Sequence, residues 1–178
     1  LNRAGLDIKK PFDTADIFPT LVDLCGLPIP QTCEGKSFAP LVTGTGDVEA
    51  GSVLIASYSP FSDWCEKKGG VEYRGLRTEQ YTYVKTIRGD EFLFDNPKDP
   101  WQMNNLADDP QYRAVKEQLK EKLAQKLLER KDEFLPKEKL WERYGYLINP
   151  QNDSVPYHKT EEWYEYHRRA QSLNPANL

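Results

Sequence analysis

The sequence is poor in the residues that most often carry metal and redox chemistry. Its 178 residues include two histidines, three cysteines and one methionine. His158 and His167 are too far apart for an i, i+4 metal pair, and neither belongs to an H-E-x-x-H motif. Cys25, Cys33 and Cys65 form no C-x-x-C pair and no even disulfide set, although Cys25 and Cys33 could bridge around a proline-rich turn. The common signatures of zinc and thiol–disulfide enzymes are therefore missing.

Two further absences limit the partners of the chain. The formal net charge is −4, so no excess of positive charge attracts a phosphate backbone, and we expect no nucleic-acid partner. No apolar run approaches the roughly 20 residues that a membrane-spanning helix needs, and we expect no membrane partner. No signal peptide is visible in the polar residues that follow Leu1, which leaves the compartment open. With 38% hydrophobic and 29% charged residues, the composition is typical of a soluble globular protein.

The first recognisable element is a short amphipathic helix over residues 16–25. Thr14 or Asp16 can cap its start, Pro19 falls early, and Gly26 suits its end. Its apolar residues recur at helical spacing and form one face: Ile17, Phe18, Leu21, Leu24 and Cys25. Such a short helix needs a partner surface, so we expect this face either to be buried against the rest of the chain or to drive self-association.

The middle of the chain predicts strands followed by a long helix. A polar linker is expected over 42–50, and strands over 52–58, 72–78, 81–87 and 91–95, the last two forming a hairpin around Arg88-Gly-Asp90. Asp109 and Pro110 begin a helix that runs to about Lys131. Its apolar stripe consists of Tyr112, Val115, Leu119, Leu123 and Leu127. From Asp132 onward we expect an irregular tail, with one helix near 159–169.

Four sequence blocks in this order resemble sulfatases. Asp16-Ile-Phe-Pro-Thr-Leu-Val-Asp-Leu-Cys-Gly is similar to D-x-x-P-T-L-L-D-x-x-G, and Gly35-Lys-Ser-Phe-Ala-Pro-Leu is similar to G-x-S-L-x-P-L. Arg74-Gly-Leu-Arg-Thr-Glu-Gln-Tyr-Thr-Tyr resembles R-x-x-R-T-x-x-Y-K-Y. The block that begins Glu91-Phe-Leu-Phe-Asp resembles E-L-Y-D-L-x-x-D-P-x-E-x-x-N-L-A. Together these blocks cover about residues 14 to 130.

The resemblance implies the C-terminal portion of an arylsulfatase-like enzyme of the alkaline-phosphatase superfamily. The implied fold class is α+β, with a four-stranded antiparallel sheet packed against a long helix and preceded by a short helix from a large α/β domain. The predicted boundaries are 1–42 for the end of that domain, 50–131 for the C-terminal subdomain and 132–178 for an irregular extension. The resemblance also favours a periplasmic or extracellular location and an N-terminal catalytic domain that precedes Leu1.

The chemistry that the resemblance implies is not found in these residues. Sulfatases make a formylglycine from C/S-x-P-x-R and hold it with a divalent metal, usually calcium. Neither the three cysteines nor the Ser59-Pro60 pair fits that motif. We therefore expect no catalytic residue, no metal site and no cofactor in this chain, and an inactive isolated chain. The whole enzyme would use calcium and formylglycine to hydrolyse sulfate esters, plausibly on a sulfated glycan.

Substrate contact is the role that this portion of the family can contribute. In the family, the loop between the first strands of the small sheet approaches the mouth of the active site, and here it spans residues 59–73. Its predicted contacts are Trp64 and Arg74, with Tyr73 behind them. The alternative is that Trp64 packs against a neighbouring domain and that Arg74 pairs with a surface acid. The remaining tryptophans, Trp101, Trp141 and Trp163, lack platform spacing, which favours packing in the core or the tail.

Two other functions remain open at this point. One is a free-standing glycan-binding or interaction module, which would bind a sulfated glycan by itself. The other is part of a phosphate or phosphonate ester hydrolase of the same superfamily, which differs from a sulfatase only in residues upstream of this chain. Asp95 and Asp99 flank a proline turn, where capping of the turn is favoured over acid–base chemistry.

Overall fold

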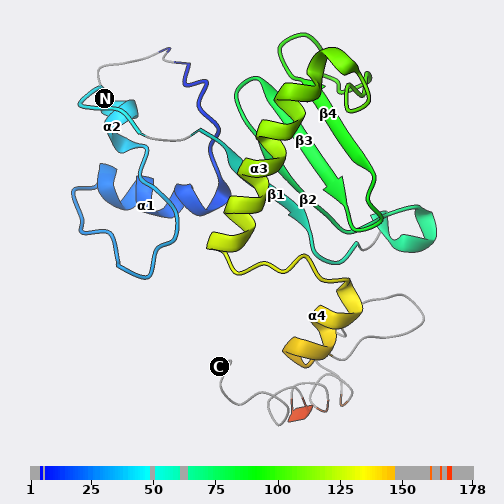
Figure 1. The fold of residues 1–178 in the computed structure, drawn as a ribbon. Helices are drawn as coiled ribbons and strands as arrows, with labels where there is room; N and C mark the ends of the chain where they lie inside the picture. The colour runs from blue at the N-terminus through cyan, green and yellow to red at the C-terminus, as the bar shows by residue number, and fades with distance from the viewer. Residues whose placement is uncertain are drawn as a thin grey trace. The chain divides into compact units, whose positions relative to one another are not determined.

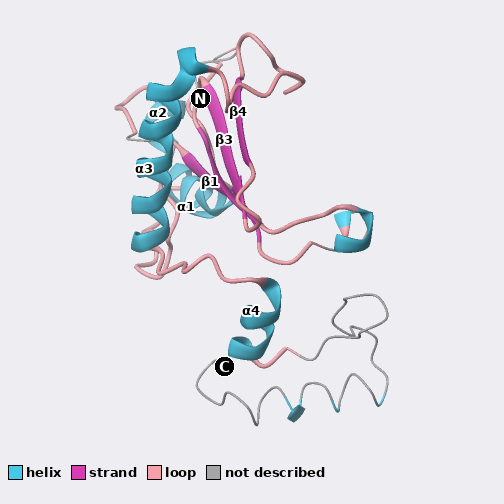
Figure 2. Ribbon diagram, turned by 45° about the vertical axis from the view of Figure 1, so that its right-hand side comes forward, coloured by secondary structure: helices cyan, strands magenta, loops and turns pink. Residues whose placement is uncertain are grey.

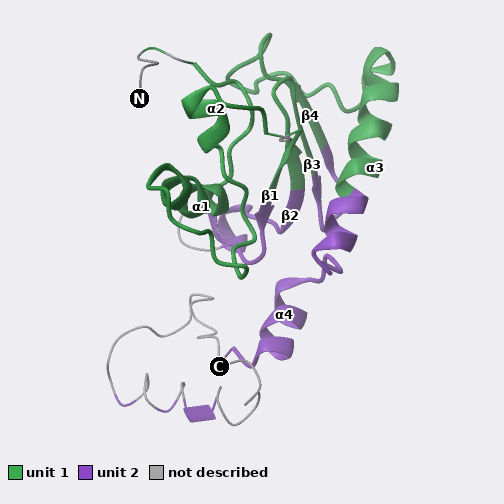
Figure 3. Cartoon of the chain, turned by 90° about the vertical axis from the view of Figure 1, so that its left-hand side faces the viewer, with its two compact units in different colours: residues 1–55, 75–84, 92–123 green, residues 56–74, 85–91, 124–178 purple. Residues whose placement is uncertain are grey.

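The structure is a computed structural model that describes residues 5, 7–48, 51–60, 64–146, 161, 165 and 168–169. Its helices are α1 (Thr14–Leu24), α2 (Ala39–Thr43), α3 (Arg113–Glu129) and α4 (Lys137–Tyr144), with 3-10 turns at Glu66–Lys68 and Pro110–Tyr112. Its strands are β1 (Val53–Ser57), β2 (Tyr73–Arg77), β3 (Tyr81–Thr86) and β4 (Glu91–Asp95) (Figures 1 and 2). The chain divides into two units, one of residues 1–55, 75–84 and 92–123, the other of residues 56–74, 85–91 and 124–178 (Figure 3).

The four strands form one antiparallel sheet in the order β1-β2-β3-β4, so each strand pairs with its neighbour in sequence. The predicted hairpin over 81–95 is confirmed. Its turn places Gly89 at φ 94°, a conformation that favours glycine, and Thr86 N–H donates to the Asp90 carbonyl at 2.9 Å. The four strands predicted from the sequence are therefore present, with ends that differ by one residue at most.

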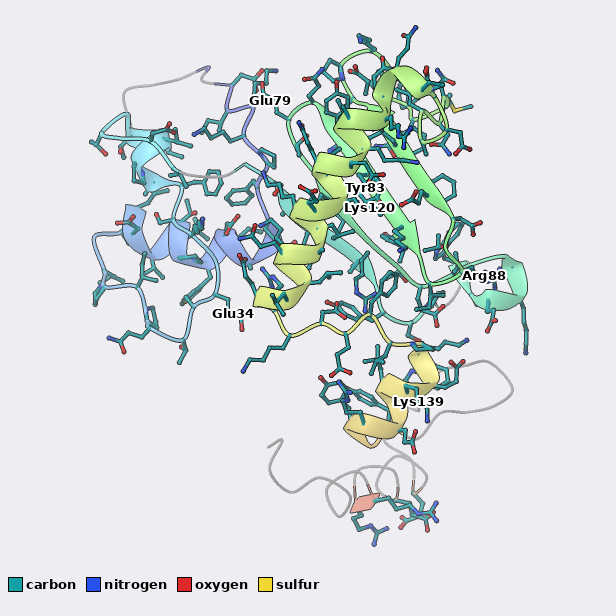
Figure 4. All side chains as sticks on the ribbon, in the orientation of Figure 1. Glu34, Glu79, Tyr83, Arg88, Lys120 and Lys139 are labelled. Atoms are coloured by element: carbon teal, nitrogen blue, oxygen red, sulfur yellow. The ribbon has the colours of Figure 1, made fainter. Side chains whose placement is uncertain are left out.

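The long helix starts as predicted. Asp109 accepts a hydrogen bond from Gln111 N–H at 2.9 Å, and Pro110 opens a 3-10 turn that continues into α3. Within the first unit, Leu119 and Leu123 of α3 are buried, as are Leu76, Tyr83 and Leu93 of the sheet. Tyr83 lies where α3 crosses in front of the sheet in Figure 4. This arrangement confirms the α+β fold, with its apolar core on one face of the sheet.

Helix α1 begins two residues earlier than expected, and the predicted cap is wrong. The N-cap is Asp13, not Thr14 or Asp16. Asp13 N–H donates to Asp16 Oδ2 at 2.8 Å, which makes Asp16 the third residue of a capping box. Gly26 ends the helix at φ 70°, as predicted.

Two segments have more structure than the sequence indicated. The predicted linker 42–50 begins inside α2, and its Val48 is buried and accepts a hydrogen bond from Lys10 Nζ at 2.7 Å. The extension contains α4, which we did not predict because only one short turn of apolar periodicity marks it. Of the helix expected near 159–169, the described residues Glu161, Glu165, Arg168 and Arg169 are helical, and the others lie outside the described residues.

The cysteines and the search for membrane spans complete the description. Cys25, Cys33 and Cys65 are free, so the Cys25–Cys33 bridge that the spacing allowed is absent from this structure. In the described part of the chain, no helix has both the length and the apolar character that crossing a membrane requires.

Candidate functional site

The first two sequence blocks form one hydrogen-bonded unit. Asp16 Oδ1 accepts a hydrogen bond from Lys36 N–H at 2.8 Å. The Thr20 hydroxyl donates to the Asp16 carbonyl at 2.6 Å and accepts from Phe38 N–H at 2.9 Å. Ser37 Oγ donates to Asp23 Oδ2 at 2.5 Å. Polar residues of α1 therefore hold the segment that follows it, and this accounts for the acidic and hydroxyl residues of the two blocks.

Proline and glycine complete this junction. Pro19 has no N–H and cannot donate to the Ala15 carbonyl one turn earlier in α1. Gly35 packs directly against that carbonyl, and a Cβ at position 35 would overlap the Ala15 oxygen. The glycine of the second block is therefore required by the close approach of two backbones.

The polar side of α1 is buried, and its predicted apolar face is not. Ile17, Phe18 and Leu21 are 45%, 55% and 57% exposed. Burial of these residues against the rest of the chain, one of the two outcomes that we expected, is therefore contradicted by the structure.

Arg74, a predicted substrate contact, lies in β2 with a side chain that is 0% exposed. Its Nε donates to Asp132 Oδ2 at 2.5 Å and its Nη2 to Asp132 Oδ1 at 3.3 Å. Its Nη1 donates to the carbonyls of Ser57 and Tyr73, and its guanidinium lies 3.8 Å from the ring centroid of Tyr58. The structure thus brings Arg74 and Tyr73 together and gives Arg74 a bidentate carboxylate partner.

The pairing of Arg74 with Asp132 affects the pKa values of Asp132 and Tyr58. Burial alone would raise the pKa of Asp132, but the hydrogen bond from Arg74, the Phe134 N–H and the charge of Arg74 together lower it below its usual range. The pKa of Tyr58 is raised, first by burial and then by the negative charge of Asp132. The carboxylate therefore stays ionised and Tyr58 stays neutral near neutral pH.

Trp64 is 55% exposed and stands at the start of the turn 64–70. Lys68 N–H and Gly70 N–H both donate to the Cys65 carbonyl, at 2.9 and 3.0 Å. Gly70 packs so closely on the Trp64 carbonyl that a Cβ at position 70 would overlap it. The turn presents a partly exposed indole on a hydrogen-bonded backbone.

Lys137, which the sequence analysis missed, lies beside this turn. Its side chain is 4% exposed, and its Nζ donates to Glu66 Oε2 at 2.8 Å and lies 5.2 Å from the ring centroid of Trp141. Its backbone N–H donates to Glu72 Oε1 at 3.0 Å. The sequence held no signal for these contacts, because the partners are far apart in the chain and the surrounding residues are densely charged.

The other residues singled out from the sequence have different places. Asp99 accepts hydrogen bonds from Met103 N–H at 3.0 Å and Asn104 N–H at 2.8 Å, which confirms its role in capping the turn. Trp101 is 84% exposed, so core packing is wrong for this residue, whereas Trp141 is half-buried against Lys137. Trp163, His158 and His167 lie outside the described residues.

The described residues offer no cluster of ligands for the metal that sulfatases use. Among the described residues, no group of three or more His, Cys, Asp and Glu side chains is arranged to hold a metal ion. The sequence contains no C/S-x-P-x-R from which formylglycine could be made. What the chain offers is an exposed aromatic ring and charged side chains beside it.

Comparison with known proteins decides the family. The model of the N-sulphoglucosamine sulphohydrolase C-terminal family matches residues 3–129. The chain belongs to this sulfatase family. It is 33% identical over 158 residues to an ulvan-active sulfatase of Formosa agariphila, covering 87% of this chain and 30% of that protein. The chain therefore corresponds to the C-terminal portion of a sulfatase and spans about a third of the relative's length.

Solved sulfatase structures share this portion of the fold. A 2-O GAG sulfatase matches with a TM-score of 0.56 and 27% identity, covering 67% of this chain and 25% of that one. A phosphonate monoester hydrolase of Agrobacterium radiobacter matches with a TM-score of 0.52 and 24% identity, covering 87% of this chain and 31% of that one. The second likeness concerns the fold alone.

Proposed function

We propose that this chain is the C-terminal part of an enzyme that hydrolyses sulfate esters on a sulfated glycan, and that its Trp64 contacts the glycan. The observation that carries the proposal is the 33% identity to an ulvan-active sulfatase along 87% of the chain. The family match over residues 3–129 supports the same assignment. The relatives extend well beyond the region matched here, and we assign the reacting groups to an N-terminal catalytic domain.

In this proposal the chain binds and orients, and the catalytic domain performs the chemistry. Formylglycine and calcium, on that domain, would supply the nucleophile and polarise the sulfate. The sequence contains no C/S-x-P-x-R, and the described residues include no group of side chains arranged to hold a metal ion, so we expect the chain by itself to release no sulfate.

Trp64 is the best-placed residue for a direct contact. A half-exposed indole on a hydrogen-bonded turn offers a flat apolar face to a sugar ring at little cost in conformational entropy. Tyr73 is half-buried at the start of β2, and its carbonyl accepts from Arg74. A direct contact by Arg74 stays a prediction. Because its donors already bind Asp132, Ser57 and Tyr73, we assign it a supporting role.

The test begins with the reading frame upstream of Leu1. If it contains C/S-x-P-x-R, the whole protein is expressed and its release of sulfate from sulfated glycans is compared with that of this chain alone. A reading frame that starts immediately before Leu1, or a whole protein that releases no sulfate from any sulfated glycan, would overturn the proposal.

The Trp64 contact is tested in the whole protein with a matched pair of variants. Trp64→Ala is expected to raise KM for the polymeric glycan about tenfold, equivalent to about 1.4 kcal/mol of binding free energy. Trp101→Ala removes the other strongly exposed indole of the described residues and is expected to leave KM unchanged. Equal effects of the two variants would show that the loss is not specific to the Trp64 turn.

Two alternatives give different outcomes in the same experiments. A glycan-binding module would show heat of binding when this chain alone is titrated with sulfated glycans in a calorimeter. A phosphonate hydrolase, the activity named for one protein of the same fold, would cleave a phosphonate monoester faster than a sulfate ester.

A further inference from the structure

The C-terminal segment 132–141 lies beyond the residues that the family model matches. The family match ends at residue 129, before Asp132, Phe134 and Lys137. These three residues nevertheless make close contacts with the segment 57–74, within the same unit of the structure. The segment therefore has a definite partner inside this chain, the segment 57–74.

One end of this contact is the buried pair of Arg74 and Asp132. The guanidinium lies between two aromatic rings, 3.8 Å from the Tyr58 centroid and 4.8 Å from the Phe134 centroid. Asp132 also accepts a hydrogen bond from Phe134 N–H at 2.8 Å. Breaking such a buried, fully engaged pair leaves an uncompensated charge, so the segment is firmly held at residue 132.

The other end is Lys137, which binds two carboxylates of the segment 57–74. Its Nζ donates a hydrogen bond to Glu66 Oε2. Glu66 Oε1 also lies 3.7 Å from Nη2 of Arg88, the residue of the β3–β4 turn that is labelled in Figure 4. Its backbone N–H donates to the side-chain Oε1 of Glu72. The backbone carbonyl of Glu72 in turn accepts a hydrogen bond from Ile87 N–H at 2.9 Å. Lys137 thus links the middle of the Trp64 turn to the strand that follows it.

Backbone contacts within the turn connect Glu66 to Trp64. Gly69 N–H donates to the Glu66 carbonyl at 2.9 Å, and Gly70 packs on the Trp64 carbonyl. The backbone from 64 to 70 therefore forms one closed unit, and fixing Glu66 fixes the backbone that carries the indole.

We propose that Arg74 and Lys137 are positioning residues, and that through them the segment 132–141 fixes the direction in which the Trp64 turn presents its indole. The consequence for substrate binding depends on the function proposed above, whereas the positioning itself does not. The segment 57–74 would supply the turn, and the segment 132–141 would determine how rigidly it is held.

Amide hydrogen exchange on the chain tests the positioning directly. Lys137→Met removes the ammonium and keeps most of the side-chain volume. We expect exchange at Lys68, Gly69 and Gly70 to accelerate about tenfold or more, with no change at the amides of β3. The matched control is Lys139→Met, which removes an exposed cation of the same helix that pairs with Glu142. Unchanged exchange at 68–70, or an equal acceleration in β3, would overturn the proposal.

Kinetics of the whole protein separate positioning from a general loss of structure. Lys137→Met is expected to raise KM for a polymeric sulfated glycan several-fold and to leave kcat/KM for a small aryl sulfate unchanged, with Lys137→Arg restoring the glycan KM. If Trp64→Ala raises KM and Lys137→Met does not, the positioning role is overturned. If Lys137→Met loosens the turn but Trp64→Ala has no effect on KM, the glycan contact fails and the positioning role stands.

Discussion

Helix α1 and residues 113–123 of helix α3 belong to the same unit. Both helices have an apolar stripe in sequence, yet only the stripe of α3 is covered. Leu119 and Leu123 of α3 are buried in the core on the sheet. Ile17, Phe18 and Leu21 of α1 are about half exposed, and the buried residues of α1 are Asp16, Pro19 and Thr20. Helix α3 is held by apolar packing, and helix α1 by hydrogen bonds from its polar side.

The difference shows what an apolar stripe does and does not predict. Periodicity indicates that a helix has a face suited to burial, but not which surface covers it. For α3 the covering surface is a sheet in this chain. For α1 no described residue covers the face, and we propose that the catalytic domain of the whole protein covers it.

The comparison predicts opposite costs for truncating the two stripes. Leu123→Ala should reduce the free energy of unfolding by about 2–5 kcal/mol, because it leaves a cavity in the core. Leu21→Ala should change it by less than about 0.5 kcal/mol, because the side chain is already in contact with solvent. Urea unfolding of the two variants measures both values, and similar costs would mean that the α1 face is covered in solution.

Removing one hydroxyl from the polar side of α1 should have the next largest effect. Thr20→Val keeps the shape of the side chain but leaves the Phe38 N–H without its acceptor, at a cost of about 1–3 kcal/mol. Thr43→Val removes an exposed hydroxyl that bonds back to Ala39 in α2, and should cost much less. Equal costs would show that α1 does not depend on its polar contacts.

Lowering the pH should reduce the contribution of the buried Arg74–Asp132 pair to the free energy of unfolding and leave the contribution of apolar packing unchanged. Because the pKa of Asp132 is lowered in the folded chain, the unfolded chain binds a proton more readily. The stabilisation is therefore complete above about pH 4, the usual range of an unfolded aspartate, and is lost as pH falls through the folded pKa. The stability difference between wild type and Asp132→Asn should stay constant above about pH 4 and shrink as the pH falls below it, whereas the difference for Leu123→Ala should stay constant throughout.

Substitutions on the exposed apolar face of α1 should have the smallest effect on the free energy of unfolding. They should have the clearest effect on self-association. We predict that the isolated chain self-associates through Ile17 to Leu24, because an exposed apolar face of this kind favours contact with a second copy. Phe18→Lys should shift the sedimentation equilibrium toward the monomer with almost no change in the free energy of unfolding. A wild-type chain that is monomeric at high concentration would contradict this prediction.

Local signals accounted for much of the fold. The hairpin 81–95 and the start of the long helix followed from turn residues and caps that act over a few positions. The signals failed where the decisive contact is distant. The position of Val48 depends on Lys10, which lies outside any short window of sequence. The cap at Asp13 was missed for another reason, because its capping box with Asp16 is local. Trp101 was expected to pack in the core or the tail and is 84% exposed.

The sequence alone determined the family, the strands, the long helix and the absence of the formylglycine motif, because each of these is written in adjacent or regularly spaced residues. Only the tertiary structure decided what the charged residues do. Arg74 and Asp132, or Lys137 and Glu66, are separated by more than fifty positions, and their pairing depends on the path that the chain takes between them. From the sequence alone, a charged residue is best interpreted as a solvated surface group. Once the fold buries the charge, it must be paired, because an unpaired buried charge is costly.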